Sequence, residues 1–163
     1  MLRPVPLRRL TIATLLCSAA VLGISFFLSN GHAQGKITHT CSAADKQFID
    51  TVSSNMTQLS YWSDSLVTGD VDPPVVVHQA NAEADQVDAT RPTDPTLDKT
   101  RFVLRGMFVQ YGKAIDAKYN GGDAGVYMGL AYTLANEAHD LLAGAQPALA
   151  AKGCDPTRLL NGG

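Results

Sequence analysis

Two widely separated cysteines, Cys41 and Cys154, enclose most of the chain that follows an apolar N-terminal run. The third cysteine, Cys17, lies inside that run, so removal of the run as a signal sequence leaves only these two. In a compartment where thiols oxidise, two cysteines allow a single intramolecular pairing. The alternative is a pair of free redox-active or metal-binding thiols, but neither cysteine has a CxxC partner or a histidine at ligand spacing. We therefore expect a Cys41–Cys154 disulfide.

The N-terminus indicates export. A basic start with three arginines precedes the uncharged apolar run 10–28, and a polar stretch follows. This order is typical of a secretory signal, and the small residues before Gln34 predict cleavage between Ala33 and Gln34. The run also reaches the length of a membrane span, so an uncleaved signal anchor is the alternative. In both cases the remainder lies outside the cytoplasm, as a secreted or cell-envelope protein, or one anchored in the membrane through residues 10–28 alone.

Charge excludes one class of partner. Without the three arginines of the signal, the chain has 10 basic and 15 acidic residues, a net charge of −5. It contains no basic tract, and the segment 64–98 holds eight acidic residues against a single arginine, Arg91. Within it, Glu83, Asp85 and Asp88 are expected to form a solvated acidic face of their helix, and a cation site is the disfavoured alternative. Since binding to nucleic-acid phosphates needs clustered lysine and arginine, we expect no nucleic-acid partner. An anionic membrane surface is disfavoured for the same reason.

Four segments have apolar side chains spaced by three and four residues, as one face of a helix requires. The expected helices cover about 43–68, 73–89 and 95–120, with the fourth starting after Asp123. Ser42 and Asp123 are expected N-caps, and Gly69 has the position of a helix-ending glycine. Gly144 and Pro147 are expected to kink or break the fourth helix before a last turn leads to the second cysteine.

These elements predict an all-α fold, an up-down-up-down four-helix bundle closed by one disulfide and preceded by an N-terminal signal sequence. The first helix starts and the fourth ends at the same end of such a bundle, which places the two cysteines side by side. The expected parts are a signal peptide or anchor (1–33), a mobile leader (34–40), the bundle (41–154) and a loose tail (155–163). Gly125, Gly129 and Thr133, spaced by four, predict close packing of the fourth helix inside the bundle.

No motif for catalysis, cofactor binding or metal binding is present in the sequence. There is no GxSxG or CxxCH, and two glutamates are too few for the Glu-x-x-His set of a di-iron bundle. His78 and His139 flank the apolar faces of their helices and are expected at the surface. We therefore predict no catalytic residue, no metal ligand and no cofactor.

Aromatic side chains on the apolar faces are the remaining candidates for a site, because a bundle can open a cavity between its helices. They are either core residues, the favoured interpretation, or the lining of a cavity for an apolar ligand: Trp62, Phe108, Tyr111 and Tyr127. The resulting hypothesis is an exported protein with a non-catalytic binding role, its partner a protein or a small apolar ligand. The alternative is a small exported helical enzyme whose site is assembled from scattered acids and tyrosines.

Overall fold

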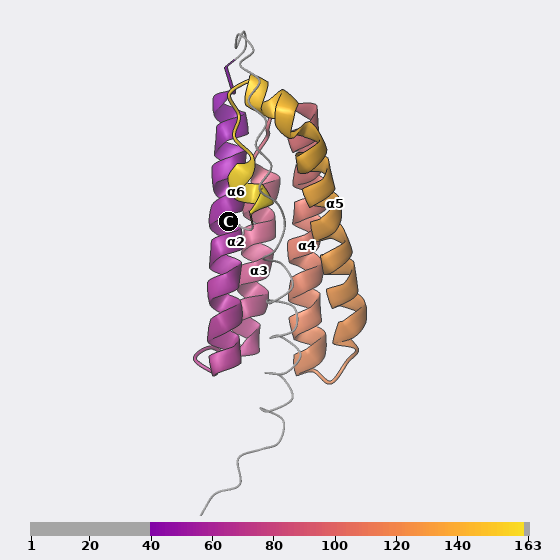
Figure 1. The fold of residues 1–163 in the computed structure, drawn as a ribbon. Coiled ribbons are helices and arrows are strands. Elements are labelled where there is room, and N and C mark those ends of the chain that lie inside the picture. Colours follow the sequence, from indigo (N-terminus) through magenta and orange to yellow (C-terminus); the bar gives the residue numbers. More distant parts are fainter. Residues whose placement is uncertain (1–39, 162–163) are drawn as a thin grey trace, which may run out of the picture.

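The computed structural model describes residues 40–161, and this part of the chain is all-helical. The four long helices lie side by side and alternate in direction, and a short fifth helix follows them (Figure 1). They are α2 (Ala43–Thr68), α3 (Pro73–Ala89), α4 (Pro95–Tyr119), α5 (Ala124–Ala151) and α6 (Thr157–Leu160). The expected signal sequence, its cleavage site between Ala33 and Gln34, and the leader lie outside the described residues, apart from residue 40.

Local side-chain chemistry sets the ends of the helices. Ser42 Oγ accepts a hydrogen bond from the backbone N–H of Asp45, and Asp94 and Asp123 cap α4 and α5 in the same way. Gly69 ends α2 with φ of +81°, a conformation that glycine adopts without steric cost. The boundaries of the first three helices therefore agree with those expected from the sequence.

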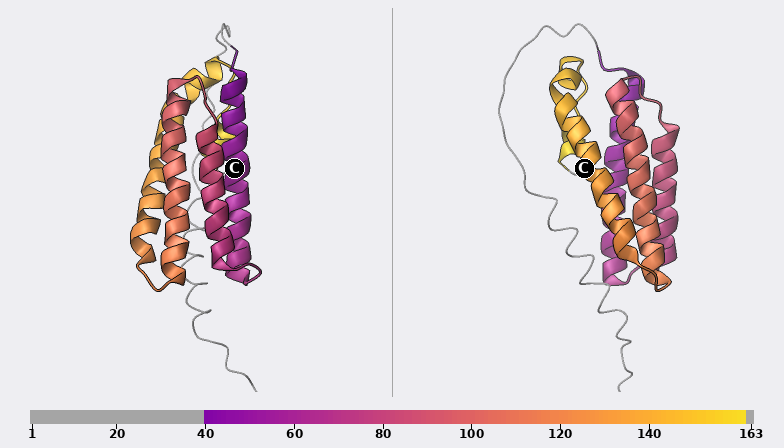
Figure 2. Two further views of the ribbon diagram at one scale, coloured as in Figure 1. Left: turned by 180° about the vertical axis from the view of Figure 1, so that it is seen from behind. Right: turned by 90° about the vertical axis from the view of Figure 1, so that its right-hand side faces the viewer.

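The disulfide between Cys41 and Cys154 is present, as predicted. The two residues are 113 positions apart in the sequence, and their Cα atoms lie 4.9 Å apart. Both side chains are buried. The bond joins the start of α2 to the end of α5, at the end of the molecule opposite the α2–α3 and α4–α5 turns (Figure 2).

The helices do not pack on one another equally. α4 lies against both α3 and α5, and α2 approaches α3 closely and α4 only slightly. No close backbone approach joins α2 to α5 in the described part of the chain, and the short α6 contacts both helices. The main apolar core includes the fully buried Phe48, Leu97 and Phe108. A smaller cluster of Leu66, Val76 and Ile115 lies toward the turns.

The end of α5 differs from the expectation in one respect. The helix continues through Gly144 and Pro147 to residue 151, so of the expected kink or break the break is wrong. Proline removes one hydrogen bond from the ladder of a helix, and that loss costs least where water can reach the freed carbonyl. Ala143, Gly144 and Pro147 are all exposed, which explains why the helix is not interrupted.

Two further expectations about the C-terminal half are wrong. The small-residue stripe does not pack inside the molecule, because Gly125, Gly129 and Thr133 are exposed and a Cβ at Gly129 would meet no neighbour within 4 Å. α5 instead buries the face that carries Ala131, Ala138, Leu142 and Leu149. The segment after the second cysteine is not a loose tail over residues 155–160, because α6 packs on α2 and α5 and its leucines contact the main core.

Candidate ligand-binding site

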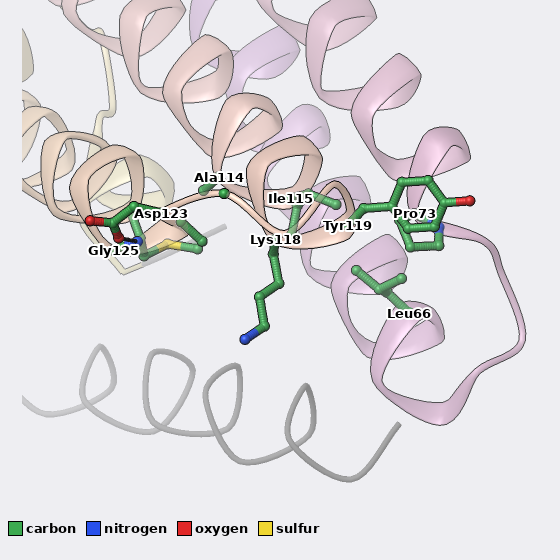
Figure 3. Close-up of a pocket in the computed structure, with 11 residues that line it drawn as sticks. Leu66, Pro73, Ala114, Ile115, Lys118, Tyr119, Asp123 and Gly125 are labelled. Atoms are coloured by element: carbon green, nitrogen blue, oxygen red, sulfur yellow. Dashed lines mark hydrogen bonds between the residues drawn. The ribbon is translucent and has the colours of Figure 1, made fainter. Parts of the chain in front are cut away.

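An apolar cavity of about 350 Å³ opens at the end of the helices that lies farthest from the disulfide (Figure 3). All four long helices and the α4–α5 turn contribute to its wall. The lining residues are Leu66, Pro73, Ala114, Ile115, Lys118, Tyr119, Gly122, Asp123, Ala124, Gly125 and Met128. Since α2 and α5 do not approach each other, the space between their ends is left for this cavity.

The wall is built from residues that the two turns bring together. Leu66 from α2 and Ile115 from α4 belong to the smaller apolar cluster and form its buried side. Ala124 and Met128 in the first turns of α5 are half-buried and form the opposite side. Gly121, with φ of +77°, allows the tight turn that returns the chain from α4 to α5.

One charge of each sign borders the cavity. Asp123 Oδ1 accepts a hydrogen bond from the backbone N–H of Gly125 at 2.9 Å, so this carboxylate caps α5. Lys118 lies in the last turn of α4, where the helix dipole favours a cation. Figure 3 shows the ammonium group of Lys118 extending away from the labelled apolar side chains, so the aliphatic part of the lysine contributes to the lining.

None of the four aromatic candidates from the sequence lines this cavity. Phe108 is fully buried in the main core. Trp62 and Tyr111 are half-buried and lie together against the smaller cluster. Tyr127, on α5, is half-buried and belongs to neither cluster. The only sequence signal for the actual lining was the glycine-rich turn at 121–125, which brings two helix ends together without large side chains.

A buried polar group lies farther inside, between α2, α3 and α4. The side chain of Glu83 is fully buried, and its Oε2 has no hydrogen-bond partner. Its Oε1 accepts a hydrogen bond from Gln79 Nε2 at 3.5 Å. Burial raises the pKa of Glu83 from 4.5 to about 7, because the charged form loses its hydration and gains no cation. Sequence reasoning placed Glu83 on a solvated acidic face, and this placement is wrong.

Tyr111 and Ser63 form the second polar contact in this region. Their hydroxyl oxygens lie 2.6 Å apart and join α4 to α2. Burial is the main cause of a raised pKa at Tyr111, and the negative charge of Glu83 adds to it. Neither Glu83 nor Tyr111 lines the cavity, so the groups with perturbed pKa values are separate from the space where a ligand fits.

One group of potential metal ligands occurs among the described residues: Cys41, Asp45 and Cys154. The two sulfur atoms are bonded to each other, so neither is a thiolate. The Asp45 carboxylate accepts hydrogen bonds from the backbone N–H groups of Thr93 and Asp94. The disulfide and these hydrogen bonds explain why the three side chains lie close together.

No protein-family model, no curated protein and no solved structure matches this chain. Over residues 40–161, the structure contains no helix that is both long enough and apolar enough to cross a membrane.

Proposed function

We propose that the protein is an exported four-helix bundle with a non-catalytic role, and that it binds a small apolar ligand in the cavity between the α2–α3 and α4–α5 turns. The apolar wall of this cavity is the observation that carries the proposal. The Cys41–Cys154 disulfide supports a secreted or cell-envelope location, because such bonds persist in oxidising compartments.

The size of the cavity limits the ligand. A water-sized group occupies about 30 Å³ of liquid volume, so about 350 Å³ fits a molecule of about ten to twelve non-hydrogen atoms. A linear alcohol such as decanol has this size. For so small a ligand, with an apolar wall as the main source of affinity, we expect a Kd in the micromolar range.

A binding role is favoured over catalysis by the position of the titratable groups. A general acid or base has to reach the bound substrate, directly or through one water. Glu83 has a pKa suited to such a role, but it is enclosed by α2, α3 and α4 and does not line the cavity. The charged groups that do border the cavity are Lys118 and Asp123, and the latter caps a helix.

Binding of decanol, followed by calorimetry on the protein purified from its exported fraction, tests the proposal. Native mass spectrometry of the same sample shows whether a ligand is retained during purification. The variant Ala124→Leu places a larger side chain at the edge of the cavity and is expected to weaken binding at least about tenfold, which corresponds to about 1.4 kcal/mol.

Ala143→Leu is the matched control, because Ala143 is exposed on the same helix and lies away from the cavity. It is expected to bind decanol as the wild type does. Equal loss of binding in the two variants, or no binding by the wild type, would contradict the proposed site.

A further inference from the structure

Of the four long helices, α2 has the fewest close backbone approaches to the others, and two of its polar contacts converge on Glu83 and its neighbour Gln79. Asn55 Nδ2 donates a hydrogen bond to the backbone oxygen of Glu83 at 3.1 Å. Gln79 Nε2 donates both to Glu83 Oε1 and to Gln58 Oε1, so it links the carboxyl group to α2. The start of α2 is fixed by the disulfide and by the Asp45 carboxylate, whereas these bonds join the middle of α2 to α3.

The surroundings of Glu83 are suited to a neutral carboxylic acid. The carboxyl group accepts a hydrogen bond from Gln79 of α3, and Tyr111 of α4 is close enough to be affected by its charge. From α2, Asn55 binds the backbone oxygen of Glu83 and Gln58 binds Gln79. Of these only Tyr111 titrates, and its ionised form would add a second negative charge. In residues 40–161, Glu83 forms no ion pair with a lysine, arginine or histidine.

Ionisation of Glu83 therefore creates a buried anion without a compensating cation. Such a charge is costly in a protein interior, and the structure lowers that cost by admitting water or by separating the helices. The separation that breaks the fewest close backbone approaches is movement of the C-terminal half of α2, a helix that approaches α4 only slightly and does not approach α5 closely. The same movement breaks the hydrogen bond between Ser63 of α2 and Tyr111 of α4.

Movement of α2 also changes the cavity. Leu66 of α2 forms part of the cavity wall and packs in the smaller apolar cluster with Val76 and Ile115. Trp62, one turn earlier on α2, packs against the same cluster beside Tyr111. A shift of the C-terminal half of α2 therefore removes one side of the cavity.

We propose that Glu83 is a proton-controlled latch: its neutral form holds α2 in place, and its ionised form loosens the helix. Ionisation of Glu83 thereby releases the ligand of the cavity. The second part, release of ligand, rests on the proposed binding function. The first part concerns the chain alone and is tested without any ligand.

The chain suits a direct test, because it has a single tryptophan, Trp62, on the helix expected to move. Acrylamide quenching of Trp62 fluorescence is measured on the oxidised protein from about pH 5 to about pH 9. We expect quenching to increase in one step with its midpoint near pH 7, the pKa of Glu83. The carboxyl ¹³C signals of Glu83 and Glu137, the two glutamates of the chain, are followed in parallel, with the exposed Glu137 as internal reference.

Glu83→Gln keeps the shape of the side chain and removes its titration, so the step in Trp62 quenching is expected to disappear. Asp85→Asn, at an exposed position on the same helix, is the matched control and is expected to retain the step. His78→Gln combined with His139→Gln removes the two exposed histidines and is also expected to retain the step. Persistence of the step in Glu83→Gln overturns the proposal, as does a wild-type Glu83 carbon signal whose midpoint lies near the ordinary pKa of 4.5.

Ligand release is then measured with decanol at about pH 5.5 and about pH 8. We expect the wild type to bind decanol about tenfold more weakly at pH 8, which lies one unit above the pKa of Glu83. Glu83→Gln is expected to bind equally at both pH values. Affinity of the wild type that is unchanged by pH overturns the link between latch and cavity. Absence of binding at either pH contradicts the proposed function, while the step in Trp62 quenching still decides whether Glu83 is a latch.

Discussion

The carboxylate of Asp45 connects the starts of two helices that are distant in the sequence, and its replacement by asparagine is expected to destabilise the fold strongly. Asp45 Oδ1 accepts hydrogen bonds from the backbone N–H groups of Thr93 at 2.7 Å and Asp94 at 2.9 Å. Its Oδ2 accepts a third from Thr93 Oγ1 at 2.9 Å. The residue is 5% exposed, so water replaces none of these bonds without rearrangement.

The size of the effect follows from these three bonds. Burial by itself raises the pKa of Asp45, but the hydrogen bonds from Ser42, Asp94 and Thr93 outweigh it and hold the pKa below its ordinary value of 3.8. A hydrogen bond to a charged group contributes about 1.5–3 kcal/mol. The amide that replaces the carboxylate keeps one acceptor oxygen and loses the charge. We therefore expect Asp45→Asn to lower the free energy of unfolding by about 2–4 kcal/mol at neutral pH.

Urea unfolding followed by Trp62 fluorescence, with the disulfide intact, measures this difference. Asp50→Asn is the control, since Asp50 is exposed on the same helix and is expected to change stability by less than about 0.5 kcal/mol. The contribution of the Asp45 charge is present above pH 3.8 and is lost as pH falls through the lower pKa of the folded state. Wild type and variant should therefore converge in acid. A loss as small as that of the control would refute the role assigned to the carboxylate.

Three further outcomes are expected. Replacing Cys154 by serine removes a cross-link over 113 positions and is expected to cost roughly 4–5 kcal/mol in the chain-entropy description, measured by urea unfolding of variant and oxidised wild type. Arg101→Met leaves Asp88 without its 2.6 Å ion pair and should lower the thermal midpoint, whereas exposed Lys99→Met should not. Because the folded pKa of Glu83 is raised, wild-type stability should fall by about 3 kcal/mol as pH rises from 4.5 to 7, and Glu83→Gln should abolish this fall in calorimetric scans.

The local elements of the fold are predictable because their causes are local. Capping side chains such as Ser42 and Asp123, and the helix-ending Gly69, act within one turn of the chain. The disulfide was also predictable, since two cysteines at the ends of an even number of antiparallel helices meet at one end.

The cavity and the burial of Glu83 depend on distances between helices, which no local pattern contains. The sequence indicated one solvated acidic face with Glu83, Asp85 and Asp88. In the structure Glu83 is buried, whereas Asp85 is exposed and Asp88 is half-buried. Likewise, the sequence predicts that the fourth helix buries an apolar face but does not state which helix covers it. In the structure α4 covers that face, and the separation of α2 from α5 and the cavity at their ends follow from this packing.

The bond between Cys41 and Cys154 closes residues 41–154, with all four long helices, into a covalent ring, and only α6 of the described helices lies outside it. The turns at Gly69 and Gly121 are exposed, as sites of proteolytic cleavage usually are, and both lie within this ring. A single cut in either turn therefore opens the ring without releasing a fragment, and all four long helices stay on one molecule. A nicked copy therefore retains every residue of the four long helices and of the core that they enclose.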